Sequence, residues 1–217
     1  MPMNKRALGS VALLALIFGA WVWLYFTLRP KGIDLNPYSA LGEAAAEETI
    51  KLLHNSGRLV LVDADFGDYK ILAPINNAQV KSFEKTIRKT HLKIAALERV
   101  SIAPPTMART GIFMQSGQIS NLVSRHRDVD AIVLFVGLAS LADFHEARSE
   151  VRKPKLVLVS NYEPYYEMLL QKRALQLAIV PRPEESSDQD KTIQSRRQWF
   201  ERHYQVVTPE RIAEQAD

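Results

Sequence analysis

The 217-residue chain contains no cysteine, so disulfide bonds, thiolate metal sites and cysteine nucleophiles are excluded. It also lacks the glycine-rich turns G-x-G-x-x-G and G-x-x-x-x-G-K-[ST], which hold the phosphates of dinucleotides and nucleotides. No G-x-S-x-G elbow is present, which weakens any serine-hydrolase interpretation. None of the five histidines has another histidine three or four residues away, so no helical metal site is visible. We therefore expect neither a metal nor a cofactor.

The excess of one charge sign is also small. The chain has 28 basic and 24 acidic side chains. Lys5 and Arg6 precede a long apolar run, whereas the first acidic residue is Asp34, so the remainder of the chain is close to neutral. No basic stripe alternates with aromatic side chains, as it does on nucleic-acid-binding surfaces. The sequence therefore predicts no nucleic-acid partner.

Charged residues are missing altogether from Ala7 to Leu28. As a helix these 22 residues span about 33 Å, which is enough to cross the hydrocarbon core of a bilayer. Trp21, Trp23 and Tyr25 gather at the C-terminal end, where amphipathic rings favour the membrane interface. The run is longer than the apolar region of a cleaved signal peptide, and it is apolar on every face, unlike a soluble helix. We therefore predict a retained transmembrane helix.

The charges on either side of this run are nearly balanced, since Lys5 and Arg6 precede it and Arg29 and Lys31 follow it. The short basic head resembles that of a signal anchor, which favours an N-terminus in the cytoplasm and a domain outside, in the periplasm. The predicted organisation is a cytoplasmic head (1–6), a transmembrane helix (7–28), a linker (29–38) and a single α/β domain (39–217).

Short apolar runs alternate with amphipathic helical segments over the rest of the chain. A helix capped by Ser39 is expected before the first run, and further helices are expected between the runs, one of them capped by Asn76 or Asn77. This alternation predicts an α/β fold with a doubly wound parallel sheet of about five strands, in the order 2-1-3-4-5, with helices on both faces. The runs predicted as strands are 58–62, 92–97, 131–136, 155–159 and 177–180, and 205–207 is compatible with a further short strand.

The first predicted strand ends in V-D-A-D-F-G-D-Y, which places Asp63, Asp65 and Asp68 at its exit. A D-x-D after an apolar strand resembles the start of haloacid-dehalogenase-like phosphatases, and Ser160 stands where their second motif would. A suitably placed lysine followed by an acidic pair is missing from this chain. A metal-dependent phosphatase is therefore an alternative hypothesis, and no catalytic residue is assigned.

Four segments together resemble the type I periplasmic binding protein superfamily, which includes sugar-binding proteins. V-K-S-F-E-K-T-I-R-K-T (80–90) and L-K-I-A-A (92–96) resemble its first helix and second strand. The segment 116–134, ending in V-D-A-I-V-L, resembles a helix that leads into the third strand, and K-P-K-L-V-L-V-S (153–160) resembles the next strand. The resemblance covers roughly 58–182. Full members have two such lobes and close on ligand between them, whereas this chain departs from them in size and has predicted strands for one lobe.

Such a lobe would bind ligand where the strand order reverses, between the first and third strands. The expected function is that of a membrane-anchored extracytoplasmic binding or accessory domain without enzymatic activity, which serves a small-molecule ligand or a protein partner. The alternatives are the phosphatase and a structural subunit of a membrane complex. The residues predicted to line the crevice follow successive strands: Asp63, Asp65, Phe66, Arg99, Gly137, Ser160 and Asn161.

Overall fold

The computed structural model describes residues 33–67, 73–102, 113–115, 117–138, 154–160, 165–182 and 195–216. From Leu35 onward the chain forms one compact unit. No helix within these described ranges has the length and apolar character to cross a membrane. The predicted transmembrane helix (7–28) lies outside the described residues, as do Asp68 and Asn161.

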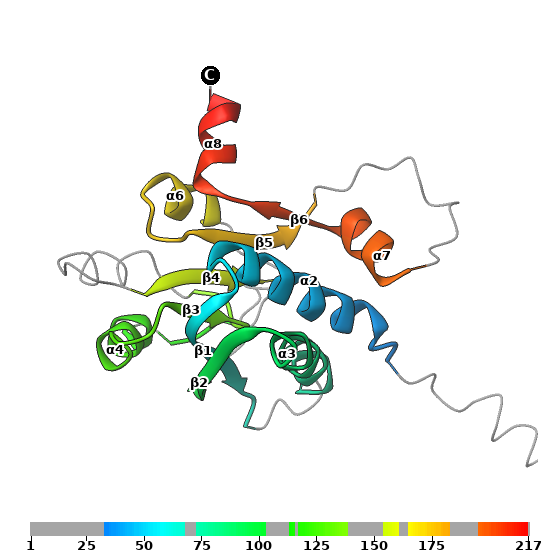
Figure 1. Ribbon diagram of the computed structural model, residues 1–217, viewed down its shortest axis with the longest axis horizontal. Helices are drawn as coiled ribbons and strands as arrows, with labels where there is room; N and C mark the ends of the chain where they lie inside the picture. The colour runs from blue at the N-terminus through cyan, green and yellow to red at the C-terminus, as the bar shows by residue number, and fades with distance from the viewer. Residues whose placement is uncertain are drawn as a thin grey trace, which may run out of the picture. The chain divides into compact units, whose positions relative to one another are not determined.

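A six-stranded sheet in the order β2-β1-β3-β4-β5-β6 forms the centre of the domain (Figure 1). The first five strands are parallel to their neighbours. The predicted order 2-1-3-4-5 is therefore confirmed. The strands are β1 (Ser56–Asp65), β2 (His91–Ser101), β3 (Ala131–Leu134), β4 (Lys155–Val159), β5 (Leu177–Pro181) and β6 (Tyr204–Val207).

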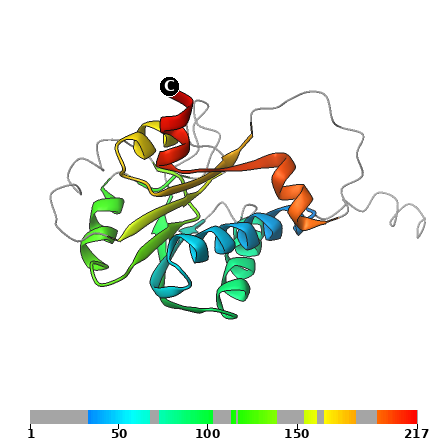
Figure 2. The ribbon, with the colours of Figure 1, turned by 45° about the horizontal axis from the view of Figure 1, so that its top comes forward.

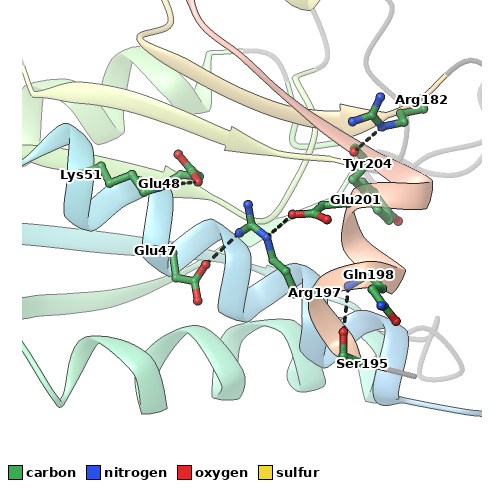
Figure 3. Close-up of polar contacts among 9 residues, drawn as sticks. All are labelled: Glu47, Glu48, Lys51, Arg182, Ser195, Arg197, Gln198, Glu201 and Tyr204. Carbon is green, nitrogen blue, oxygen red and sulfur yellow. Dashed lines mark hydrogen bonds and ion pairs between the residues drawn. The ribbon is translucent and has the colours of Figure 1, made fainter. Parts of the chain in front are cut away.

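The sixth strand makes the sheet mixed rather than wholly parallel. β6 runs antiparallel to β5, with Ala178 opposite Val207 and Pro181 opposite Tyr204. The expectation of a purely parallel sheet is wrong at this edge, because the chain returns from the carboxyl end of β5 and pairs directly with it. Arg182, directly after β5, stabilises this antiparallel pairing, since its Nε donates a hydrogen bond of 2.9 Å to the carbonyl of Tyr204 at the start of β6 (Figure 3).

Helices cover both faces of the sheet, as predicted (Figures 1 and 2). In β1, Leu59 and Leu61 pack with one apolar cluster and Val60 and Val62 with the other, so the strand is buried on both sides. One face carries α2 (Asn36–Leu52), α3 (Ala73–Ile87) and α7 (Arg196–His203); the other carries α4 (Gln118–Arg125), α6 (Tyr166–Gln171) and α8 (Pro209–Ala216).

Two predicted helix caps are wrong. α2 begins at Asn36, inside the segment expected to be linker, because Pro37 fits the first turn of a helix, and Ser39 already donates its backbone N–H to the Leu35 carbonyl. α3 begins at Ala73, so Asn76 lies inside the helix rather than at its cap. The side chain of Asn76 is buried and serves another role, described below.

The helices α2 and α3 pack closely against each other (Figure 2). The absence of a side chain at Gly42 permits this approach, since a Cβ there would lie 2.0 Å from the carbonyl oxygen of Gln79. Beneath them, the rings of Phe83 on α3 and Phe135 after β3 meet edge to face with centroids 5.5 Å apart. This packing fixes α3 over the carboxyl half of β1.

Candidate ligand-binding edge of the sheet

The carboxyl ends of β1 and β2 place an acidic and a basic residue side by side. Asp63 on β1 is the register partner of Arg99 on β2, and Asp65 is the partner of Ser101. Paired residues on adjacent strands project to the same face, so Asp63 and Arg99 share the face covered by α3. Two of the predicted site residues are therefore brought together by the sheet itself.

A β-bulge in β2 is responsible for this pairing. The register shifts between Leu59 and Val60, so that Leu59 is opposite Ile94 but Val60 is opposite Ala96. Without the extra residue, Asp63 would stand opposite Glu98, another acid, and Arg99 would face the other side. With the bulge in place, Glu98 faces α4.

On the α4 side, Glu98 has a histidine and an arginine as neighbours. Its carboxylate lies 2.9 Å from His126 Nε2 and 3.3 Å from an Arg125 guanidinium nitrogen. The bulge therefore gives each acid a compatible neighbour on its own face of the sheet.

The carboxylate of Asp63 is buried and hydrogen-bonded. Its Oδ1 accepts a hydrogen bond of 2.8 Å from the Ala64 backbone N–H and a second one from the amide of Asn76. Burial raises the pKa of Asp63 above its ordinary value, while these two hydrogen bonds and the nearby Arg99 charge act in the opposite direction. At 4% exposure, Asp63 is better placed to hold α3 against β1 than to reach a solute.

Asp65, by contrast, is exposed at the strand exit. Its Oδ1 accepts a hydrogen bond of 3.2 Å from the backbone N–H of Gly67, which closes a tight turn. Gly67 adopts a φ of +46°, a conformation that glycine takes without strain. Phe66, between them, is buried. Asp65 and Arg99 are thus the exposed charges at the ends of β1 and β2.

A short segment, Phe113–Gln115, occupies the place that β1 would take if it continued. Met114 bridges to Ile102 beyond β2, and Phe113 bridges to Gly137 beyond β3. The Met114 N–H donates a hydrogen bond of 2.9 Å to the Gly137 carbonyl. Phe113 and Met114 are both buried. They fill the space between the continuations of β2 and β3, beside the place where the crevice was predicted.

Gly137 and Ser160 lie at the same edge but differ in their distance from β1. Gly137 follows β3, the neighbour of β1, whereas Ser160 follows β4, one strand further away. The backbone N–H of Ser160 donates a hydrogen bond of 3.1 Å to the Ile179 carbonyl, and the residue is buried. The structure thus gathers Asp63, Asp65, Arg99 and Gly137 and places Ser160 to one side; whether they bind ligand stays a prediction.

Sequence reasoning missed Asn76, Phe113 and Met114 as parts of this edge. Asn76 carried only the signal of a helix cap, and nothing in its spacing linked it to Asp63. The short apolar run before Ser116-Gly117 was the available signal for Phe113 and Met114, because it follows a proline-rich loop and precedes a helix. Among the described residues, no group of three His, Asp or Glu side chains is arranged to hold a metal ion.

No protein-family model and no curated protein matches this chain. Solved structures do. An arabinose-binding protein from Geobacillus stearothermophilus has a TM-score of 0.53 at 17% identity, over 82% of this chain and 63% of that one. The periplasmic binding protein component of the arabinose ABC transporter from Shewanella sp. ANA-3 has a TM-score of 0.53 at 13% identity, over 82% and 59%.

A sugar-binding protein of a sugar ABC transporter from Bacillus halodurans matches with a TM-score of 0.52 at 11% identity, over 82% of this chain and 64% of that one. The chain therefore spans about three fifths of the length of these proteins. At such identities the likeness concerns the fold, and it agrees with the resemblance expected from the four sequence segments. The chain has the fold of a single lobe of a periplasmic binding protein.

Proposed function

We propose that the protein is a membrane-anchored extracytoplasmic domain that binds a small polyhydroxylated ligand, of the monosaccharide class, at the carboxyl edge of its sheet. It acts without enzymatic chemistry. The observation that carries the proposal is that Asp65 and Arg99, at the ends of the adjacent strands β1 and β2, are exposed charges of opposite sign. A carboxylate accepts and a guanidinium donates hydrogen bonds, which together suit neighbouring hydroxyl groups.

Two further considerations support this placement. Open α/β sheets bind ligands outside the carboxyl ends of their strands, at the point where the strand order reverses. Here that point lies between β1, which carries Asp65, and β3. By analogy of fold, arabinose-binding and sugar-binding proteins among the solved structures suggest the same class of ligand.

The phosphatase alternative finds less support. It requires the first aspartate of the D-x-D to attack a phosphate, but the Asp63 carboxylate is buried and accepts hydrogen bonds from Ala64 and Asn76. A nucleophile needs access to its substrate. A phosphatase assay with Mg²⁺ that compares wild type with Asp63→Asn distinguishes the two functions, and we expect no Asp63-dependent turnover.

A lone lobe covers one side of a ligand, whereas a closed site buries most of the ligand surface. We therefore expect an affinity of about 1 mM, weaker than that of a two-lobed protein. A second chain that supplies the opposite wall would raise it. Saturation-transfer NMR on the full chain in detergent micelles, with L-arabinose as the probe, detects binding in this range.

Anchoring and orientation are tested separately. We expect the chain to stay with the membrane fraction after alkaline carbonate extraction, as an integral protein does. Protease added to intact spheroplasts should then digest the domain, and lysis before digestion serves as the control. Release by carbonate would contradict the anchor, and protection of the domain in spheroplasts would contradict the orientation.

A further inference from the structure

A basic groove lies on the α2–α3 face, and the exposed charges Asp65 and Arg99 are not among the residues that line it. It has a volume of about 590 Å³ and is bounded by α3, the start of α2 and the start of α7. Its cations are Lys81, Lys85 and Arg196, and Ser39 and Ser82 add hydroxyl groups. The described residues that line it include no acid.

The spacing of the lysines in α3 explains why this helix contributes two cations to the groove. Lys81 and Lys85 are four residues apart and lie on one face of the helix, while Val80, Phe83 and Ile87 are buried on the other. Both lysines are exposed, and neither has an ion-pair partner in the part of the chain that the structure describes. Two exposed ammonium groups on one face of a helix, with no ion pair to a described acid, favour an anionic ligand.

Arg196 approaches from the opposite wall. It pairs with Glu43 of α2 at 3.5 Å, with both side chains about half exposed. An exposed pair of this length is weak and readily exchanges its partner for a stronger anion such as a phosphate. The next residue, Arg197, is oriented differently, since it lies between Glu47 and Glu201 (Figure 3) and does not line the groove.

The sequence distance between the groove and the proposed membrane helix indicates which anion the groove binds. Leu35 lines the groove, and the apolar run ends at Leu28, seven residues earlier. An extended chain covers at most about 3.5 Å per residue, so the groove lies within roughly 25 Å of the end of the proposed membrane anchor. A cationic site tethered so close to a bilayer experiences a high local concentration of lipid phosphates.

From the groove, its two lysines, its weakly paired Arg196 and this tether we propose that Lys81, Lys85 and Arg196 bind the phosphate headgroup of an anionic phospholipid. The inference rests on the proposed membrane anchoring and deepens it, because the contact orients the domain on the bilayer surface. Asp65 and Arg99 do not line the groove, so the proposed sugar contacts are not part of this one. Each cation near a charged membrane surface contributes a factor of about five in affinity.

The test reconstitutes the full chain in vesicles of phosphatidylcholine alone, or of phosphatidylcholine mixed with phosphatidylglycerol. A membrane-impermeant amine-acetylating reagent is added, and the modification of each lysine is measured by mass spectrometry. We expect Lys81 and Lys85 to be protected several-fold in the anionic vesicles, and Lys89 and Lys93, which lie outside the groove, to react equally in both. Molar salt should remove the protection, because it screens exposed charges.

Arg196→Gln and Arg197→Gln form a matched pair of variants, because each removes one half-exposed cation from the same helix turn; Arg196 loses one ion pair and Arg197 loses two. Protection of Lys81 and Lys85 should fall about fivefold in Arg196→Gln and stay unchanged in Arg197→Gln. Equal labelling in both kinds of vesicle would overturn the inference, and so would an equal effect of the two variants.

The experiment also distinguishes a site for free phosphate, and a failure of the membrane anchor, from the proposed headgroup contact. If inorganic phosphate protects the two lysines in detergent micelles while anionic vesicles do not, the groove takes a free phosphate and the lipid assignment is wrong. If carbonate extraction releases the chain from the vesicles, the anchoring itself fails, and this is seen before any labelling. Retention of the chain with uniform labelling contradicts only the headgroup contact.

Discussion

The Asp63 carboxylate at the end of β1 accepts a hydrogen bond from the Asn76 amide in the first part of α3, and both side chains are almost fully buried. This contact connects a strand end to the helix that follows it, across a turn of the chain. It holds α3 over β1, next to the edge where we propose ligand binding. The first two predictions concern this pair.

The burial of Asp63 makes stability depend on pH. Because its pKa is raised in the folded state from the value of 3.8, the folded chain holds this proton more tightly than the unfolded chain. The contribution of Asp63 to the free energy of unfolding therefore falls as pH rises upward from about 3.8 through the folded-state pKa. Asp63→Asn should gain stability relative to wild type over that window, in urea unfolding at successive pH values. A difference that shrinks with rising pH would contradict the raised pKa.

Removal of the Asn76 side chain, which donates a hydrogen bond to Asp63, should destabilise the fold at neutral pH. Asn76→Ala leaves a buried carboxylate without one of its donors, which we expect to lower the free energy of unfolding by about 1–3 kcal/mol. Asn77→Ala is the control, because Asn77 is exposed one residue further along the same helix. It should change stability by less than about 0.5 kcal/mol. Equal effects of the two variants in urea unfolding would show that the contact contributes little.

The close approach of α2 and α3 predicts that a side chain added at Gly42 lowers the free energy of unfolding. Helix propensity alone favours alanine over glycine by roughly 1 kcal/mol. At Gly42, however, the added Cβ would meet the Gln79 carbonyl oxygen, which is backbone and cannot move aside. Gly42→Ala should therefore lower the free energy of unfolding by about 1–3 kcal/mol. A stabilised variant would mean that the helices separate without penalty.

A fourth prediction concerns the attachment of α7 to α2. Arg197 donates hydrogen bonds of 3.0 Å to Glu47 and 2.7 Å to Glu201 (Figure 3). Because all three side chains are about half exposed, a double-mutant cycle on Arg197 and Glu47 should give a coupling of only about 0.2–1 kcal/mol. The coupling should vanish in molar salt. A coupling that persists there would indicate a contact other than charge.

Much of the fold could be predicted from the sequence, because apolar strands buried on both faces alternate with amphipathic helices in this chain. The strand order followed from the handedness of the crossovers. What could not be predicted depends on contacts distant in sequence. Nothing local indicates that β6 turns back along β5, or that Asn76 bonds Asp63 rather than capping its helix.

The partner of Asp63 at the candidate edge could not be predicted from the sequence either. The bulge in β2 decides whether Arg99 or Glu98 stands beside Asp63, and the alternation of side chains in L-K-I-A-A-L-E-R-V does not reveal it. The small Ala95 and Ala96 at this position tolerate an extra residue in the strand. The sequence thus identified the acidic and basic residues of the edge, and the sheet register supplied their partners.

The most direct test of the proposed function is a comparison of sugar binding by two variants of β2. Saturation-transfer NMR with L-arabinose should show saturable binding near about 1 mM in the wild-type full chain. Arg99→Ala should abolish the signal, whereas Lys93→Ala, an exposed cation at the other end of the same strand, should leave it unchanged. Binding that survives Arg99→Ala, or no saturable binding of L-arabinose in wild type, would contradict the account.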